Sequence, residues 1–229
     1  MNVNKFIEEL KDILKDKLET IFVYGSKTGI PAYDLKEGAD LMIIVQDLKA
    51  EDLKSCTKAV YKWTRKNPVP VFMSTSEWFS SADVYPMEYA DIKENHHILY
   101  GTDIIGVIDV KYDDLRLQCE REAKNMLMRF RKEYLLFVPN KKRLERLILA
   151  SLATAMAVLK AVLRLKNLPA GETPYETVRA AGECGAVNSE FFEELILFKE
   201  GRKKLADIDK TAQKFIDEAD RLLKYTDKL

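Results

Sequence analysis

The segment IFVYGSKTGIPAYDLKEGADLMIIV, residues 21–45, decides how the first half of this 229-residue chain folds. Residues 21–24 and 41–45 are short apolar runs rich in β-branched or aromatic side chains, which is typical of strands buried on both faces. The polar stretch between them opens with Gly25 and ends with Asp40. We therefore predict two strands whose polar connection carries a binding site.

Gly25, Ser26 and Lys27 are candidates for binding a phosphate group. A strand that ends in Gly-Ser and turns into a helix presents backbone N–H groups and a hydroxyl to an anion, because glycine permits close approach and the helix N-terminus carries partial positive charge. The same residues also fit a plain strand-to-helix turn with Ser26 as N-cap. Gly-Ser alone does not decide between the two interpretations.

Asp40 is a candidate metal ligand and catalytic residue at the start of the second strand. Residues two apart on a strand share a face, so Asp40, Met42 and Ile44 are expected on one face of the sheet. A carboxylate at a strand end beside a phosphate-binding turn is well placed to hold Mg²⁺ that bridges nucleotide phosphates. The alternative is that Asp40 merely ends a polar loop.

Helices and a third strand are expected around this pair. Apolar residues at every fourth position predict an amphipathic helix over residues 4–18. Residues 50–66 predict a crossover helix, which makes the strand at 41–45 parallel to a strand at 69–75. Pro68 just before the latter and Pro70 within it indicate an edge strand or a strand start.

Residues 76–110 have a less regular pattern, which predicts a helix near 86–95 and a short apolar segment near 104–110. His96 and His97 are adjacent, and on a helix such neighbours point about 100° apart, so they seldom ligate one ion. We expect one of them to pack against the sheet and the other to face solvent.

The second half of the chain has only helical patterns. Residues 144–165 are apolar nearly all round, which is typical of the central helix of a bundle. Thr173-Pro174, Ser189 and residues 205–223 indicate three further helices. The fold class is thus α+β: an N-terminal domain over 1–111 with a mixed sheet and flanking helices, then an all-helical bundle domain over 112–229.

The spacing of Gly25-Ser26 and the strand Asp40-Leu41-Met42 resembles the nucleotidyltransferase superfamily, whose pattern is Gly-Ser, a spacer and a strand beginning Asp-x-Asp. An α/β unit followed by a helical domain is similar to kanamycin nucleotidyltransferase and related enzymes. The resemblance implies that Ser26 binds the phosphates of an NTP and that Asp40 holds Mg²⁺. The sequence departs from the pattern at Met42, because a thioether does not ligate a hard cation that prefers charged oxygen.

A third acid completes the site of that superfamily or acts as general base on the acceptor hydroxyl. The predicted strand at 69–75 contains no acid. The nearest candidates are Glu77, Glu88 and Asp91, and we prefer Glu88 as the catalytic residue. Each of the three also fits a solvated or helix-capping role.

The composition indicates which partners and which cellular location to expect. Lys and Arg number 37 and Asp and Glu also 37, so the net charge is zero and nucleic-acid binding is not expected. Three scattered cysteines indicate neither a disulfide framework nor a zinc site. No stretch is expected to reach the roughly 20 apolar residues of a membrane helix. We expect a cytoplasmic protein without a membrane partner.

Two functions remain open from the sequence. The first is transfer of a nucleoside monophosphate from NTP to a hydroxyl of a small molecule or protein. The second is a catalytically degenerate nucleotide-binding or protein-interaction module, of a regulatory or toxin–antitoxin type, in which the bundle is the working surface and a homodimer forms. Met42 is the residue that makes the second hypothesis necessary, because two-metal phosphoryl transfer depends on metal electrostatics.

Overall fold

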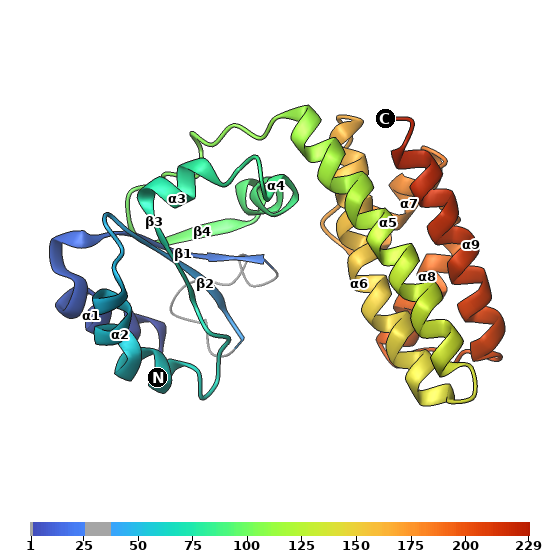
Figure 1. Ribbon diagram of the computed structural model, residues 1–229, viewed down its shortest axis with the longest axis horizontal. Helices are drawn as coiled ribbons and strands as arrows, with labels where there is room; N and C mark the ends of the chain where they lie inside the picture. The colour runs from blue at the N-terminus through green and yellow to red at the C-terminus, as the bar shows by residue number, and fades with distance from the viewer. Residues whose placement is uncertain (1, 26–37) are drawn as a thin grey trace. The chain divides into compact units, whose positions relative to one another are not determined.

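The computed structural model describes residues 2–25 and 38–229. The chain forms two compact units, Met1–Val110 and Lys111–Leu229, and each is described by itself. The first unit contains a sheet with helices on both faces, and the second is all helical (Figure 1). The predicted fold class, a mixed sheet with flanking helices followed by a helical bundle, is confirmed.

The sheet has four strands in the described residues, in the order β3-β2-β1-β4. They are β1 (Leu18–Tyr24), β2 (Asp40–Val45), β3 (Val71–Ser74) and β4 (His96–Gly101). β1 is antiparallel to both β2 and β4, whereas β2 and β3 are parallel, as the crossover helix predicted. β3 therefore lies at one edge of the sheet and β1 lies in its interior.

Helices α1 (Val3–Leu14) and α2 (Ala50–Trp63) cover one face of the sheet (Figure 1). Leu41, Ile43 and Val45 of β2 belong to the core on this face, and the rings of Phe6 and Trp63 stack there with centroids 4.8 Å apart. The helix predicted over 4–18 ends earlier, because a turn of 3₁₀ helix, η1 (Lys15–Lys17), leads directly into β1.

Helices α3 (Thr75–Ser80) and α4 (Pro86–Glu94) cover the other face. Their core is aromatic: the rings of Trp78 and Tyr89 stack at 4.5 Å, and Trp78 meets Phe22 of β1 edge to face at 5.4 Å. α4 confirms the helix predicted near 86–95. The apolar segment near 104–110 has no regular secondary structure, but Ile105 and Ile108 in it are buried in this core.

His96 and His97 lie on strand β4, so their predicted placement on a helix is wrong. The first histidine pairs with Tyr24 and the second with Val23, and neighbours on a strand point to opposite faces. His96 is half-buried and His97 is exposed. One ring therefore packs on the sheet and the other faces solvent, as predicted. The reason is the alternation of side chains along a strand, not their rotation around a helix.

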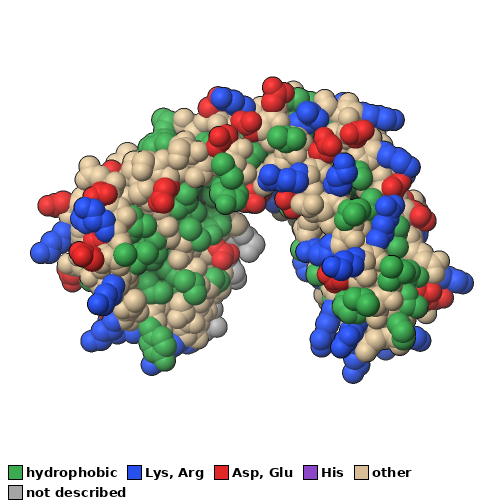
Figure 2. Space-filling model, viewed as in Figure 1, with side chains coloured by type: hydrophobic (Ala, Val, Ile, Leu, Met, Phe, Trp, Pro, Cys, Tyr) green, Lys and Arg blue, Asp and Glu red, His purple; other side chains and the backbone are tan. Residues whose placement is uncertain are grey.

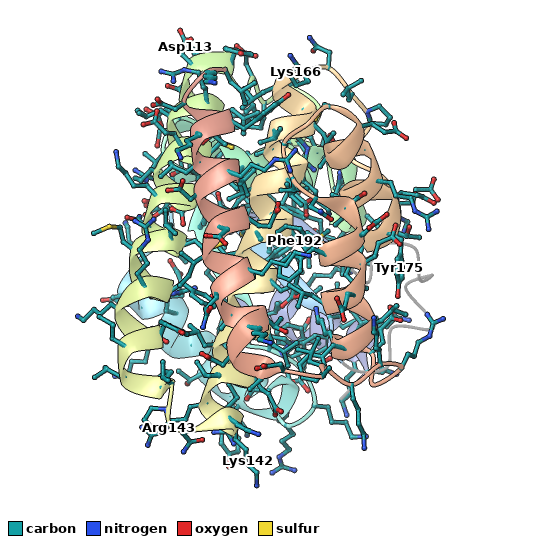
Figure 3. The ribbon with its side chains drawn as sticks, turned by 90° about the vertical axis from the view of Figure 1, so that its right-hand side faces the viewer. Asp113, Lys142, Arg143, Lys166, Tyr175 and Phe192 are labelled. Atoms are coloured by element: carbon teal, nitrogen blue, oxygen red, sulfur yellow. The ribbon has the colours of Figure 1, made fainter. Side chains whose placement is uncertain are left out.

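The second unit is a bundle whose three long helices lie side by side (Figure 1). They are α5 (Tyr112–Phe137), α6 (Lys141–Leu165) and α9 (Ile208–Thr226), with the shorter α7 (Pro174–Glu183) and α8 (Ser189–Lys199) beside them. Thr173 caps α7 as predicted, whereas Asn188, not Ser189, caps α8. Phe192 of α8 points into the bundle, and Lys142 and Arg143 extend from the first turn of α6 (Figure 3).

Helix α6 is the centre of the bundle. Leu144, Ile148, Ala155, Val158 and Val162 are fully buried along it, and it packs against α5, α7, α8 and α9. By length and composition α6 is also apolar enough to cross a membrane, the one such helix in the described part of the chain. The prediction that no stretch reaches that length is therefore wrong for α6, although a bundle's core helix has the same composition.

Val158→Asp should unfold the bundle or leave the protein insoluble. The Val158 side chain is 0% exposed, and an unpaired charge buried there costs several kcal/mol, which exceeds the stability margin of most domains. Circular dichroism and thermal melts of the soluble fraction measure the effect. Leu135→Asp is the matched control, because Leu135 is 78% exposed on α5. Equal melting of the two variants would contradict the central position of α6.

Candidate functional site

Asp40 and Gly25 lie next to each other at the end of the β1–β2 pair. In the antiparallel register, Tyr24, the last residue of β1, is opposite Asp40, the first residue of β2. Gly25 follows with φ of 76°, a conformation that side-chain-bearing residues rarely adopt. A Cβ atom added to Gly25 would be 4.0 Å from Asp40 Oδ2. The carboxylate that the sequence predicted as a metal ligand therefore lies beside Gly25, the first residue of the predicted phosphate-binding turn.

Asn67 fixes the chain just before Asp40. Its buried side chain accepts a hydrogen bond from the Ala39 N–H at 3.4 Å and donates one to the Trp63 carbonyl at 3.3 Å. These bonds tie the start of β2 to the end of α2. Nothing in the sequence around Asn67, which precedes Pro68, indicates this long-range role.

The backbone N–H of Gly25 is already engaged in the structure. It donates to the carbonyl of Asn95, at the end of α4, over 3.2 Å. The nitrogen of Gly25 therefore donates within the protein, and the predicted role of Gly25 in phosphate binding stays a prediction. Ser26 and Lys27 lie outside the described residues, so their predicted role as phosphate ligands stays a prediction.

Met42 is part of the core that α3 and α4 form with the sheet. Its side chain is 6% exposed and lies in a cluster with Phe22, Ile44 and Trp78. Leu41, Ile43 and Val45 point into the opposite core, which confirms the predicted alternation along β2. The position that would carry a second carboxylate is therefore filled by an apolar side chain that the fold uses for packing.

Tyr24 lies between Asp40 and His96 on neighbouring strands. Burial, and after it the negative charge of Asp40, raises the pKa of the Tyr24 phenol above its ordinary value. The phenol therefore stays protonated and can donate a hydrogen bond to an anion at this end of the sheet. The sequence analysis had assigned Tyr24 to the strand and given it no role in the site.

The three acidic candidates for the general base lie on α3 and α4. Glu88 is exposed in the first turn of α4. Glu77 accepts a hydrogen bond from the Ser74 N–H at 2.7 Å in a capping box, and this bond lowers its pKa. Asp91 accepts a bond from Asn95 at 3.4 Å. Glu77 thus has the helix-capping role given above as its alternative, while the assignment of Glu88 as base remains a prediction.

His96 and Asp103 form a second polar pair near the same end of the sheet. His96 Nδ1 is 2.8 Å from the carbonyl oxygen of Ile92, and Nε2 is 3.7 Å from Asp103 Oδ2. Backbone hydrogen bonds from Ile105 and, more weakly, from Gly106 lower the pKa of Asp103, with a smaller contribution from His96. The Asp103 side chain also accepts the Ile105 N–H at 2.8 Å, which fixes the turn of the chain after β4.

The residues present fit a magnesium ion that arrives with a nucleotide. No group of three or more His, Cys, Asp or Glu side chains lies close enough to hold a metal ion within residues 2–25 and 38–229. Mg²⁺ needs fewer protein ligands, because it keeps several waters and is usually bound by one or two carboxylates together with substrate phosphates. Asp40 supplies one such carboxylate.

No protein-family model and no curated protein matches the chain. Among solved structures, it is similar to a spectinomycin adenyltransferase from Enterococcus faecialis, determined with ATP and spectinomycin. The TM-score is 0.57 at 11% sequence identity, and the match covers 96% of this chain and 100% of the other. The two proteins therefore share a fold.

Gly25→Ala should destabilise the protein by about 1–2 kcal/mol, because alanine at φ of 76° adopts a left-handed conformation that costs this much. Thermal or urea unfolding measures the loss. Gly106→Ala is the control, since a Cβ there meets nothing within 4 Å and its φ is not in the left-handed region. If both variants unfold like the wild type, the turn after β1 does not have the described backbone conformation.

Proposed function

We propose that the protein binds an NTP at the turn after β1 and transfers its nucleoside monophosphate to a hydroxyl group of a small-molecule acceptor. The observation that carries the proposal is the position of Asp40 beside Gly25, at the end of two paired strands. The shared fold supports it, because the spectinomycin adenyltransferase was solved with ATP and with a small-molecule acceptor.

Asp40 is the residue that would hold Mg²⁺, and the ion would neutralise charge on the phosphates when it is bound. The acceptor oxygen forms a bond to the α-phosphorus, the bond from that phosphorus to the bridging oxygen of the β-phosphate breaks, and pyrophosphate leaves. Glu88 is the proposed base that takes the hydroxyl proton. The Tyr24 hydroxyl, which stays protonated, is placed to donate to an anionic oxygen at the strand ends.

The second candidate function is nucleotide binding without transfer. The burial of Met42 in the core between the sheet and α3 favours it, because the chain cannot place a second carboxylate there without losing apolar packing. Such a protein would act as a regulatory or interaction module. Nucleotide titration combined with a transfer assay separates the two functions, since the module binds NTP and releases no pyrophosphate.

Asp40→Asn should weaken the binding of Mg²⁺–ATP by about 10- to 100-fold, the loss expected when a charge-assisted interaction of about 1.5–3 kcal/mol is removed. Without Mg²⁺ the same variant should bind ATP as well as the wild type or better, because a carboxylate repels a bare triphosphate. Isothermal titration calorimetry with ATP, GTP, CTP and UTP, each with and without Mg²⁺, measures both effects.

Asp47→Asn is the matched control, because Asp47 is an exposed acid just beyond the other end of β2, where it pairs with Lys49 at 3.0 Å. This variant should bind like the wild type. Glu88→Gln should also keep nucleotide affinity but stop transfer. Equal Mg²⁺ dependence in Asp40→Asn and the wild type would refute the proposed metal ligand.

Met42→Asp should place a second carboxylate near Asp40, on the same face of β2. Without metal the variant should be less stable by about 2–4 kcal/mol, because the new charge is buried among apolar side chains. Mg²⁺ and ATP should recover part of that loss, since a ligand that binds only the folded state raises its stability. Thermal melts with and without Mg²⁺–ATP measure the recovery.

Met42→Asn is the control for this experiment, because it makes the same change of shape without adding a charge. It should lose stability but gain no more from Mg²⁺–ATP than the wild type does. If Met42→Asp behaves like Met42→Asn, then the missing carboxylate is not the only feature that separates this site from a two-metal site.

A further inference from the structure

The edge of the sheet next to Asp40 exposes apolar side chains. Val69 is 71% exposed, Val71 is 41% exposed and Met73 is half-buried. We call these three residues the β3 strip. Figure 2 shows hydrophobic side chains gathered on the visible face of this unit, over the region where Figure 1 draws β3. Exposed apolar side chains at a sheet edge expose the protein to unwanted association, so their presence needs a reason.

The β3 strip is continuous with the proposed site. Val71 pairs with Met42 in the parallel register, and Met42 is the next residue after Asp40 on the same face of β2. Strand residues two apart are about 6.7 Å apart and neighbouring strands about 4.8 Å, so Val71 lies roughly 8 Å from Asp40 between Cα atoms. That distance is the length of a small acceptor molecule placed beside the phosphates.

The strip offers no charge to an acceptor. Residues 67–76, which contain the whole of β3, have no charged side chain. Val71 and Met73 are the side chains on the face of β3 that continues from Met42. A cationic acceptor would need an acid at one of these positions to pair with. A charged amine that lost its water against the strip would find no carboxylate on the strip to pair with, which is unfavourable for binding.

We propose that the β3 strip binds the body of the acceptor and that the acceptor is an uncharged alcohol or phenol with an apolar, aromatic or aliphatic body. The proposal rests on the proposed function, and it names the class of acceptor for that site. The apolar body covers Val71 and Met73, and the hydroxyl group extends toward Asp40 and the nucleotide. An acceptor with charged amines would have to lose water against the strip, which carries no acid, so it should bind there more weakly.

The experiment titrates the full chain with 2-naphthol, an uncharged aromatic alcohol, and with spectinomycin, each in the presence and absence of Mg²⁺ and a non-hydrolysable ATP analogue. Intrinsic fluorescence of the naphthol and calorimetry report binding. The wild type should bind 2-naphthol more tightly than spectinomycin. Val71→Glu should weaken naphthol binding by at least about tenfold, because the ligand would then cover a charge.

Leu53→Glu is the matched control, since Leu53 is 43% exposed on α2, which covers the opposite face of the sheet. It should bind 2-naphthol like the wild type, and both variants should melt near the wild-type temperature. Tighter binding of spectinomycin than of 2-naphthol, or equal naphthol affinity in Val71→Glu and Leu53→Glu, would overturn the proposal.

ATP titrations of the same proteins separate this proposal from the proposed function. If ATP binds but Val71→Glu has the same naphthol affinity as the wild type, then the proposed acceptor class is wrong and the nucleotide site stands. If ATP does not bind but Val71→Glu still abolishes naphthol binding, then the apolar site stands without transfer. Size-exclusion chromatography with light scattering adds a third arm: a dimer that Val71→Glu converts to a monomer would make the strip a subunit interface and overturn its role as acceptor site.

Discussion

The antiparallel pairing of β1 with β2 is the constraint on which the site depends. It brings together the end of β1 and the start of β2, which are separated in sequence, and it sets Tyr24 opposite Asp40. Gly25, which follows β1 with a positive φ, lies beside the Asp40 carboxylate. Two further hydrogen bonds hold this end of the sheet. The Ala39 N–H, just before β2, donates to the Asn67 side chain, and the Gly25 N–H donates to the Asn95 carbonyl at the end of α4. The end of the sheet that carries Asp40 is therefore fixed by the pairing of β1 with β2 and by bonds to residues that follow α2 and α4.

The same pairing explains why Met42 cannot be regarded as a simple loss of function. Alternation along β2 divides its side chains between two cores, and the core with α3 and α4 is closed by the stacked rings of Trp78 and Tyr89. An acid at position 42 would border this aromatic core and would need a metal ion as counter-charge. Methionine removes that requirement, because it fills an irregular apolar space at no electrostatic cost. Position 42 is thus apolar, and Asp40 is the one carboxylate on β2.

The sequence predicted the elements that have a strong and continuous pattern. β2 and α6 fall in this group. The apolar residues of β2 are buried on both faces, and the large apolar side chains of α6 are buried along most of its length, although Ala150, Ala153 and Ala157 are exposed. β4 was missed because it begins with His96 and His97 and is only partly buried, so it lacks the apolar signal of an inner strand. Asn67 and Asn95 were missed as supports of the site because each acts through a hydrogen bond to a residue distant in sequence, which no local pattern encodes. The value of Asp40 as a candidate could be predicted, since strand periodicity fixes the face of its side chain.

One carboxylate and an uncharged acceptor surface are consistent with each other in electrostatic terms. A site with two acids can bind two divalent ions and can also attract a cationic acceptor, because its net charge before binding is more negative. Here Asp40 is opposed by no second acid on β2 and by no acid on β3. An apolar acceptor that covers Val71 and Met73 would also exclude water from the neighbourhood of Asp40, and a lower local dielectric strengthens the attraction between a carboxylate and a metal-bound phosphate. Under the proposed function, dehydration would then supply part of the affinity that a second carboxylate would supply through charge, and nucleotide and acceptor would favour each other's binding.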